Sequence, residues 1–293
     1  MSGLLADRVA IITGAGKGLG RAHALAMAQN GARIVVNDVD AEGAAQVCRE
    51  IVDGGGQALS SGANVQELNE IGNMVAETIH RWGQVDILVN NAGILRDKTF
   101  AKIDLADFRQ VLDVHLMGSV NCTRAVWLHM KERNYGRVIL TTSSSGLYGN
   151  FGQSAYSAAK MALVGLMQTL ALEGTRYGIH VNCLAPSAAT QMTSNLLTPE
   201  DLLALDPRLV SPAVVALASE RAPNKQILLA GAGSFEQAHV TMTRGLYLPD
   251  HNVSAEQILD RWDRIGDRSG EFVPSSGSEQ YKFEVARATE HTS

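Results

Sequence analysis

Three polar side chains in the middle of the chain carry groups that can move a proton together. Tyr156 and Lys160 lie four positions apart in the stretch SAYSAAK, which has helical composition, and Ser143 precedes the tyrosine by thirteen residues. A spacing of four on a helix places the tyrosine and the lysine on one face. A phenol has an ordinary pKa of about 10, and a nearby ammonium favours the phenolate. The pattern predicts that Tyr156 exchanges a proton with an alcohol or carbonyl oxygen, which Ser143 holds by a hydrogen bond.

A glycine-rich turn predicts the second reactant, a dinucleotide. The stretch TGAGKGLG, residues 13–20, follows an apolar run and opens a helical stretch with the spacing T-G-x-x-x-G-x-G. Glycines let the backbone approach a pyrophosphate, and free N–H groups at the helix N-terminus bind it. The Tyr–Lys spacing alone is common and also fits a surface pair, but together with this turn it favours catalysis. The expected contacts from the turn are Gly14, Gly16, Lys17, Gly18, Leu19 and Gly20.

Asp38 ends the second apolar run and predicts which cofactor binds. A carboxylate there can accept hydrogen bonds from ribose hydroxyls and repels a 2′-phosphate, so we expect NAD rather than NADP. A helix N-cap is an alternative role for Asp38, compatible with the first, and Lys17 offers a charge that can attract a phosphate.

The elements that must position these groups are indicated by apolar runs that alternate with amphipathic stretches. Apolar strands without polar alternation are typical of a parallel sheet covered by helices on both faces. We therefore expect an α/β fold, a Rossmann-type doubly wound parallel sheet of about seven strands. The carboxyl end of its fifth strand delivers Ser143 to the ligand-binding edge, and the next helix returns Tyr156 and Lys160 over it. The expected strands are 8–14, 33–38, 57–64, 85–93, 136–144, 179–186 and 226–231, and the main helices are 20–31, 40–53, 66–82, 105–133 with a break near Gly118, and 155–177.

The domain organisation follows from where this alternation stops. We expect one domain over residues 1–248 and a C-terminal extension over 249–293, with a helix near 254–265 that Ser254 caps and a polar tail after it.

Composition and charge exclude several classes of function. The net charge of -5 lacks the basic excess of a nucleic-acid binder, and no window predicts a membrane span or a signal peptide. Three cysteines far apart predict buried thiols in a reducing compartment, and the eight histidines show no metal-ligand spacing, so no metal is expected.

The motifs together resemble the short-chain dehydrogenase/reductase superfamily, across roughly residues 5–235. They are TGAGKGLG, NNAG at 90–93, Ser143 and YSAAK. The resemblance implies catalytic roles for Ser143, Tyr156 and Lys160, with Tyr156 and Lys160 also contacting the cofactor and Lys160 holding its nicotinamide ribose. It further implies a homodimer or homotetramer built through helices 105–133 and 155–177. The remaining cofactor contacts it implies are Asn64, Val65, Asn91, Ala92, Gly93 and Thr190.

Two positions depart from the superfamily pattern. His115 lies where many members have an asparagine that carries a proton-relay water, and Pro186-Ser187 replaces Pro-Gly. His115 is therefore a candidate proton relay, with a structural histidine as the alternative.

A narrower resemblance accounts for both departures. The stretches NNAGILRDKTFAKI, VHLMGS, GLYGNFGQSAYSAAK, NCLAPSAATQMT and GAGSF are similar to the dehydrogenase unit of peroxisomal multifunctional enzyme type 2, which is of the 17β-hydroxysteroid dehydrogenase type 4 kind. This resemblance implies NAD-dependent oxidation of (3R)-3-hydroxyacyl-CoA, fatty or steroid-derived, to 3-oxoacyl-CoA. It also suggests a stand-alone cytoplasmic enzyme, because the final residues HTS differ from an S-K-L address.

On the substrate side, Leu95, Tyr148 and Phe151 are expected near the pocket mouth. Arg96 and Lys98 are candidates for CoA phosphates or else solvated charges, and 187–212 is a lid or a surface loop. Three other functions stay open: a 17β-hydroxysteroid dehydrogenase acting on free steroids, a 3-oxoacyl reductase, and an NAD-sensing regulatory protein without turnover.

Overall fold

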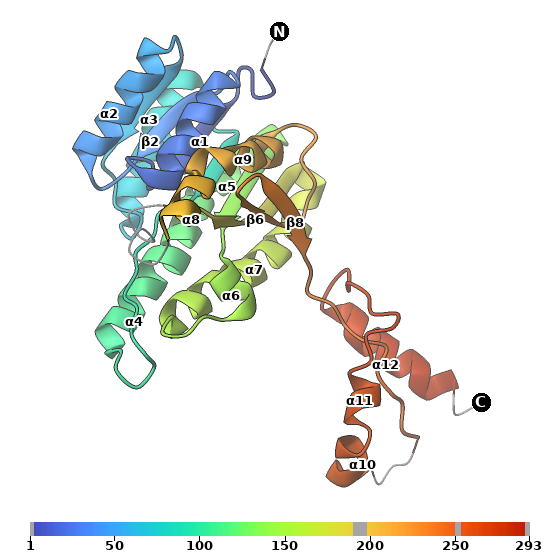
Figure 1. Cartoon of the computed structure of the whole chain (residues 1–293). Coiled ribbons are helices and arrows are strands. Elements are labelled where there is room, and N and C mark those ends of the chain that lie inside the picture. The colour runs from blue at the N-terminus through green and yellow to red at the C-terminus, as the bar shows by residue number, and fades with distance from the viewer. Residues whose placement is uncertain (1–2, 190–197, 250–252, 291–293) are drawn as a thin grey trace. The chain divides into compact units, whose positions relative to one another are not determined.

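The chain forms two compact units in a computed structural model that describes residues 3–189, 198–249 and 253–290 (Figure 1). The first unit is Met1–Ala238 and the second is His239–Ser293. We expected the division at residue 248, and the packing of the chain places it at residue 238. The candidate site lies within the first unit.

The first unit is built on one eight-stranded sheet with the order β3-β2-β1-β4-β5-β6-β7-β8. The expected doubly wound α/β fold is confirmed, with strands β1 to β7 all parallel. The eighth strand is an addition that pairs antiparallel with β7 at the edge. The strands are β1 Val9–Thr13, β2 Arg33–Asn37, β3 Gln57–Ser61, β4 Ile87–Asn90, β5 Gly136–Thr141, β6 Ile179–Ser187, β7 Ile227–Gly231 and β8 Ser234–Ala238.

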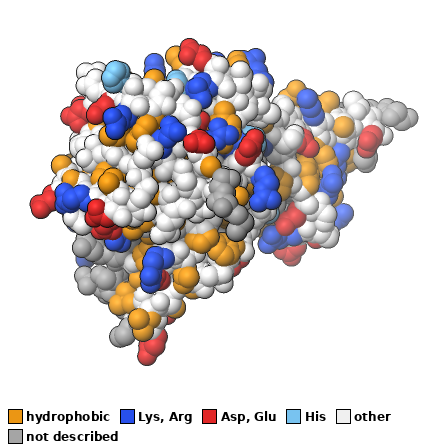
Figure 2. Space-filling view, turned by 90° about the horizontal axis from the view of Figure 1, so that it is seen from above, with side chains coloured by type: hydrophobic (Ala, Val, Ile, Leu, Met, Phe, Trp, Pro, Cys, Tyr) orange, Lys and Arg blue, Asp and Glu red, His pale blue; other side chains and the backbone are white. Residues whose placement is uncertain are grey.

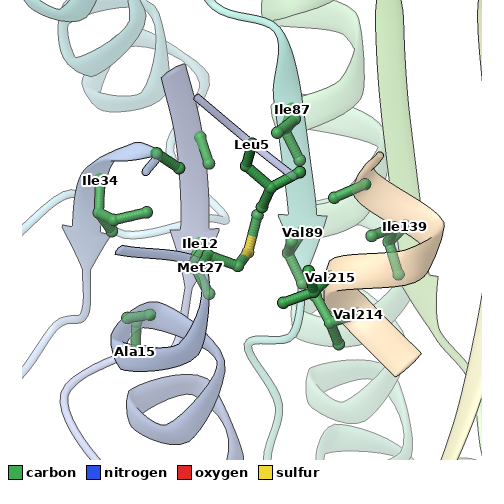
Figure 3. Packing of buried hydrophobic residues seen from close by; sticks show 14 of the residues in the cluster. Leu5, Ile12, Ala15, Met27, Ile34, Ile87, Val89, Ile139, Val214 and Val215 are labelled. Carbon is green, nitrogen blue, oxygen red and sulfur yellow. The ribbon is translucent and has the colours of Figure 1, made fainter. Parts of the chain in front are cut away.

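Helices cover both faces of this sheet because successive strand residues point to opposite sides. On β1, Ile12 belongs to a hydrophobic core that includes side chains of α1, α2 and α9. Figure 3 shows part of this core, with Met27 of α1 and Val214 of α9. Ile11, its neighbour, packs on the opposite face with α3, α5 and α7. The helices of the first unit are α1 Gly18–Gln29, α2 Ala41–Asp53, α3 Leu68–Trp82, α4 Leu105–Leu112, α5 Gly118–Arg133, α6 Ser144–Tyr148, α7 Ser154–Gly174, α8 Pro199–Ala204 and α9 Ser211–Ala218, with short 3₁₀ turns η2 Thr175–Tyr177 and η4 Pro207–Leu209.

The long helix expected over 105–133 contains a π-helical turn. Helix α4 runs into the π-helix η1 Asp113–Met117, and α5 continues from Gly118. The irregularity thus ends directly before Gly118, near which a break was expected. Single π turns inside α-helices occur frequently at functional sites, and this one carries His115.

Helix α7 combines length with an apolar composition. The helical stretch Ser154–Tyr177 is long and apolar enough to cross a membrane by length and composition alone, with 39% of its most apolar window buried. A core helix of a globular protein passes the same test, and Leu163, Val164 and Met167 of this helix pack on the sheet.

The second unit is a small helical extension in which none of the described residues 239–249 and 253–290 is fully buried. The helix expected near 254–265 is divided into α10 Ala255–Leu259 and α11 Trp262–Ile265, and Ser254 caps α10 through a capping box with Gln257. The polar stretch after it forms α12 Ser278–Glu290. The Arg244 guanidinium lies 4.5 Å from the ring centre of Phe272, which pairs by a β-bridge with Met242.

The described surface turned to the viewer in Figure 2 intersperses Lys and Arg with Asp and Glu rather than gathering either sign. This distribution agrees with the absence of a basic excess in the sequence.

Candidate active site

Ser143, Tyr156 and Lys160 come together at the carboxyl end of β5. Ser143 is the N-cap of α6, where its Oγ accepts a hydrogen bond from the backbone N–H of Ser145 at 3.1 Å. Tyr156 hydrogen-bonds with Ser143, and the Lys160 Nζ lies 5.5 Å from the centre of the Tyr156 ring. The structure thus gathers the three side chains that the sequence singled out.

Lys160 is held rigidly from both ends. Its Nζ donates to the carbonyl oxygen of Thr141 at 2.5 Å, and its own carbonyl accepts a hydrogen bond from Thr142 Oγ1 at 2.7 Å. The residue is 3% exposed, and this burial lowers the pKa of Lys160 to about 7 because a charge is costly away from water. Thr141 was not identified from the sequence, because its contribution is a backbone carbonyl.

Burial also controls Tyr156. Desolvation raises the pKa of the Tyr156 phenol, the hydrogen bond with Ser143 opposes this rise, and the charge of Asp97 adds to it. We expected Lys160 to lower the Tyr156 pKa. Burial of the phenol is instead the largest influence on its pKa. Burial also lowers the pKa of Lys160 to about 7, so the lysine carries only part of its charge near neutrality.

His115 lies under the same tyrosine. The two rings meet edge to face, with centres 5.2 Å apart and an angle of 87° between their planes. The His115 Nε2 lies 2.7 Å from the carbonyl oxygen and 3.0 Å from the amide nitrogen of Ile94, and no described residue pairs with its Nδ1. Burial and the nearby Lys160 lower the pKa of His115 to about 3, so its imidazole is neutral at ordinary pH.

Gly93 explains how the histidine fits there. A Cβ built on Gly93 would lie 2.3 Å from His115 Cε1, closer than any real carbon contact. Gly93, the glycine of NNAG, therefore makes room for the imidazole. From the sequence we expected this glycine to contact the cofactor.

The glycine turn has the open backbone that a pyrophosphate needs. Gly14 and Gly18 adopt positive φ angles of 62° and 57°. A Cβ on Gly20 would lie 2.2 Å from the carbonyl oxygen of Gly14, so only glycine allows this close approach. Lys17 and Gly18 are exposed at the start of α1, whereas Gly16 and Leu19 are partly buried.

Asn91 and Thr13 brace this turn from β4 and β1. The Asn91 Nδ2 donates to the carbonyl oxygens of Thr13 and Gly14 at 2.9 and 3.0 Å. The Thr13 Oγ1 accepts from the backbone N–H groups of Asn91 and Ala92, each at 3.0 Å. Thr13 was missed as a positioning residue, although the T of the T-G-x-x-x-G-x-G spacing was the available signal.

Asp38 lies beside the turn, and the helix N-cap, which was its alternative role, is a different residue. Its Oδ2 accepts a hydrogen bond from the Gly16 N–H at 2.9 Å, and its Oδ1 accepts from the Asp40 N–H at 3.0 Å. Asp40 is the N-cap of α2, because its side chain accepts from the Gly43 N–H at 3.1 Å. Asp38 is partly exposed at the end of β2, where a ribose that continues from the pyrophosphate would lie.

Asn64 and Val65 follow β3 at the same sheet edge. Val65 is buried against Gly118, and its carbonyl accepts a hydrogen bond from Asn121 Nδ2 at 3.0 Å. The Asn64 side chain accepts from the Gln66 N–H at 3.1 Å. Thr190 lies outside the described residues. The glycine cradle, its bracing amide and the adjacent carboxylate together fit a dinucleotide.

The substrate-side residues differ in exposure. Leu95 is partly buried, whereas Tyr148 and Phe151 are 69% and 90% exposed. Arg96 and Lys98, the candidates for CoA phosphates, both pair with Asp107, at 3.5 and 2.9 Å. Among the described residues no group of three or more His, Cys, Asp or Glu side chains could hold a metal ion.

Comparison with known proteins relates this geometry to a family. The sequence profile described as short chain dehydrogenase matches residues 8–201. A short-chain type dehydrogenase/reductase of Mycobacterium tuberculosis is 44% identical over 274 residues, which cover 90% of this chain and 96% of that protein. The peroxisomal multifunctional enzyme type 2 of Mus musculus is 42% identical over 282 residues, which cover 92% of this chain and 38% of the mouse protein.

Solved structures agree with the sequence comparison. The full-length peroxisomal multifunctional enzyme type 2 of Drosophila melanogaster has a TM-score of 0.83 and 36% identity, covering 97% of this chain and 50% of that one. A 7α-hydroxysteroid dehydrogenase in complex with NADH and 7-oxo glycochenodeoxycholic acid has a TM-score of 0.74 and 30% identity, covering 80% of this chain and 96% of that one. This chain thus spans half of the Drosophila protein and 38% of the mouse protein.

Proposed function

Because this chain belongs to the short-chain dehydrogenase family, we propose that it oxidises (3R)-3-hydroxyacyl-CoA thioesters to 3-oxoacyl-CoA with NAD. The observation that carries the proposal is the convergence of Ser143, Tyr156 and Lys160 beside a glycine turn flanked by Asp38. The acyl group is fatty or steroid-derived.

The residues of this chain account for the proton side of the reaction. Ser143 donates a hydrogen bond to the substrate oxygen, and the Tyr156 phenolate takes the hydroxyl proton as the C–H bond at C3 breaks. A bound nicotinamide would supply the acceptor for the hydride that leaves C3. Lys160, anchored on the Thr141 carbonyl, would hold the nicotinamide ribose and favour the phenolate once charged.

The thioester class is supported by what the relatives are named for. Besides the peroxisomal multifunctional enzymes, a 3-oxoacyl-[acyl-carrier-protein] reductase of Synechocystis is 42% identical over 194 residues. A (2S)-[(R)-hydroxy(phenyl)methyl]succinyl-CoA dehydrogenase subunit of Thauera aromatica is 41% identical over 180 residues. Both names specify a thioester substrate with an oxygen at the reacting carbon.

The cofactor assignment rests on Asp38. A carboxylate just after the second strand would repel the 2′-phosphate of NADP. Two backbone N–H groups, from Gly16 and Asp40, hold the Asp38 carboxylate in place. This argues against an NADPH-driven 3-oxoacyl reductase. A second candidate, oxidation of free 17β-hydroxysteroids, is favoured by the likeness to the 7α-hydroxysteroid dehydrogenase. An NAD-sensing protein without turnover does not explain the retained Tyr156 and Lys160.

A homo-oligomer is part of the proposal. The outer sides of α5 and α7 expose the large apolar side chains Leu128, Met161 and Leu172. A second copy of the chain would cover them, which fits the assembly that the sequence led us to expect.

The experiment is a substrate panel measured by initial rates of NADH formation. It includes (3R)-3-hydroxyacyl-CoAs of several lengths, their (3S) isomers and free 17β-hydroxysteroids, each also with NADP. We expect preference for the (3R) thioesters and for NAD. Turnover of free steroids alone would contradict the substrate class, and equal rates with NADP would contradict the role of Asp38.

A further inference from the structure

A side-chain amide three residues before Tyr156 joins three segments of the candidate site. The Gln153 Oε1 accepts hydrogen bonds from Ser145 Oγ at 2.8 Å and from Asn150 Nδ2 at 3.1 Å. Its Nε2 donates to Asp97 Oδ2 at 2.6 Å. An ionised carboxylate can only accept, so the atom that faces Asp97 must be the amide nitrogen, and the orientation of Gln153 is fixed.

The joined segments are those that surround the reacting oxygen. Asp97 lies between β4 and α4, three residues after Ile94, which contacts His115. Ser145 lies two residues after Ser143, and Gln153 directly precedes α7. The network therefore fixes the position of the Asp97 carboxylate relative to the Ser143 and Tyr156 hydroxyls.

The charge of Asp97 has no ionic partner in the part of the chain that the structure describes. Its neighbours in sequence, Arg96 and Lys98, both pair with Asp107. Lys98 also lies 3.8 Å from Asp104. The hydrogen bond and charge of Asp107 raise the pKa of Lys98, which shows how fully that lysine is engaged. The Asp97 carboxylate on the segment between β4 and α4 thus carries a negative charge that these two cations do not pair with.

The Asp97 charge acts on the Tyr156 phenol together with the other groups that surround this ring. Lys160 comes from its own helix, the neutral His115 from η1, and Ser143 from the end of β5. Asp97 is the one among them that brings a negative charge, and that charge adds to the raised pKa of the phenol. A substrate with a free carboxylate near its hydroxyl would meet the same charge, whereas an ester or thioester would not.

We infer that Asp97, held by Gln153, is a specificity-determining residue that favours 3-hydroxy thioesters over the corresponding free hydroxy acids. The inference rests on the proposed oxidation of 3-hydroxyacyl groups and adds the feature that excludes the unesterified acid. A protein can gain specificity by placing a charge that repels an unwanted ligand of the same sign.

The test compares wild type with Asp97→Asn on two substrates of the same acyl group. They are the uncharged N-acetylcysteamine thioester of (3R)-3-hydroxybutyrate and free (3R)-3-hydroxybutyrate. Asparagine retains an oxygen for the Gln153 amide and removes only the charge. We expect the ratio of kcat/KM for the acid to that for the thioester to rise roughly twofold to fivefold, as for other exposed charge pairs.

Asp104→Asn is the matched control, because it removes the same charge from the same segment while asparagine still caps α4. We expect its ratio to stay at the wild-type value. An unchanged ratio in Asp97→Asn, or an equal rise in Asp104→Asn, would overturn the inference.

A second readout separates this inference from the proposed function. Oxidation needs the Tyr156 phenolate, and the Asp97 charge raises the pKa of this phenol. Asp97→Asn should therefore move the acidic limb of the profile of kcat/KM against pH to lower pH. A limb that does not move overturns the role of Asp97. If wild type oxidises neither the thioester nor the acid, the proposed substrate class fails. The same limb, measured on the free hydroxysteroid that is then turned over, still tests whether the Asp97 charge acts on the Tyr156 phenol.

Discussion

Acidification should destabilise the first unit through a buried histidine outside the candidate site. His23 lies on α1, the helix that the glycine turn opens, and is fully buried. Its Nδ1 lies 3.0 Å from Ser211 Oγ at the start of α9, and no described residue pairs with its Nε2. Burial lowers the pKa of His23 to about 3.

The magnitude follows from proton linkage. The unfolded chain binds a proton at this histidine below about pH 6.5, whereas the folded chain does so only near pH 3, so stability falls as pH drops from 6.5 toward 3. Each pH unit in that window costs about 1.4 kcal/mol per such group. Between pH 7 and pH 5, His23 should therefore remove about 2 kcal/mol from the free energy of unfolding. His115, with the same lowered pKa, contributes a similar amount.

The assay is urea unfolding of wild type and His23→Asn at both pH values. Asparagine keeps a polar group near Ser211 but does not titrate, so its loss between pH 7 and pH 5 should be about 2 kcal/mol smaller than the wild-type loss. The exposed His80 on α3 supplies the control His80→Gln, which should behave like wild type. Equal losses in wild type and His23→Asn would refute the reasoning.

Three further outcomes follow from the site. Gly93→Ala pushes a methyl group against the His115 ring and should cost roughly 1–3 kcal/mol of stability. Adding His115→Ala removes that ring, so the double variant should recover part of the loss in a thermal melt. Asp38→Asn removes the charge beside the ribose, so the ratio of kcat/KM with NADP to that with NAD should rise, and an unchanged ratio would show that Asp38 does not select the cofactor. Lys160→Met removes the anchored ammonium and should raise the KM for NAD as well as lower kcat, whereas an effect on kcat alone would place Lys160 away from the ribose.

The parallel sheet could be predicted because its strands are uniformly apolar and separated by amphipathic helices. Strand β8 could not, since its residues SFEQA are largely exposed and carry no buried pattern. Helix α12 was missed for a related reason: its polar sequence has no buried face that would mark it as a helix.

The convergence of Ser143, Tyr156 and Lys160 was predictable from spacing and topology, but their electrostatics were not. Burial of Tyr156 and Lys160 depends on segments far away in sequence, and it reverses the simple expectation for the tyrosine pKa. The π turn at His115 adds one residue to a helical repeat, which sequence periodicity does not resolve. Of the two acids Asp38 and Asp40, only the hydrogen bond from the Gly43 N–H to the Asp40 side chain shows that the second caps α2.

The most direct test of the central claim is the turnover of Tyr156→Phe beside wild type, with a (3R)-3-hydroxyacyl-CoA and NAD under single-turnover conditions. Phenylalanine keeps the ring that meets His115 and removes the hydroxyl that Ser143 bonds. The account predicts that NADH formation slows by about a hundredfold or more, the usual contribution of a general base, while NAD binding persists. A variant that forms NADH at the wild-type rate would contradict it.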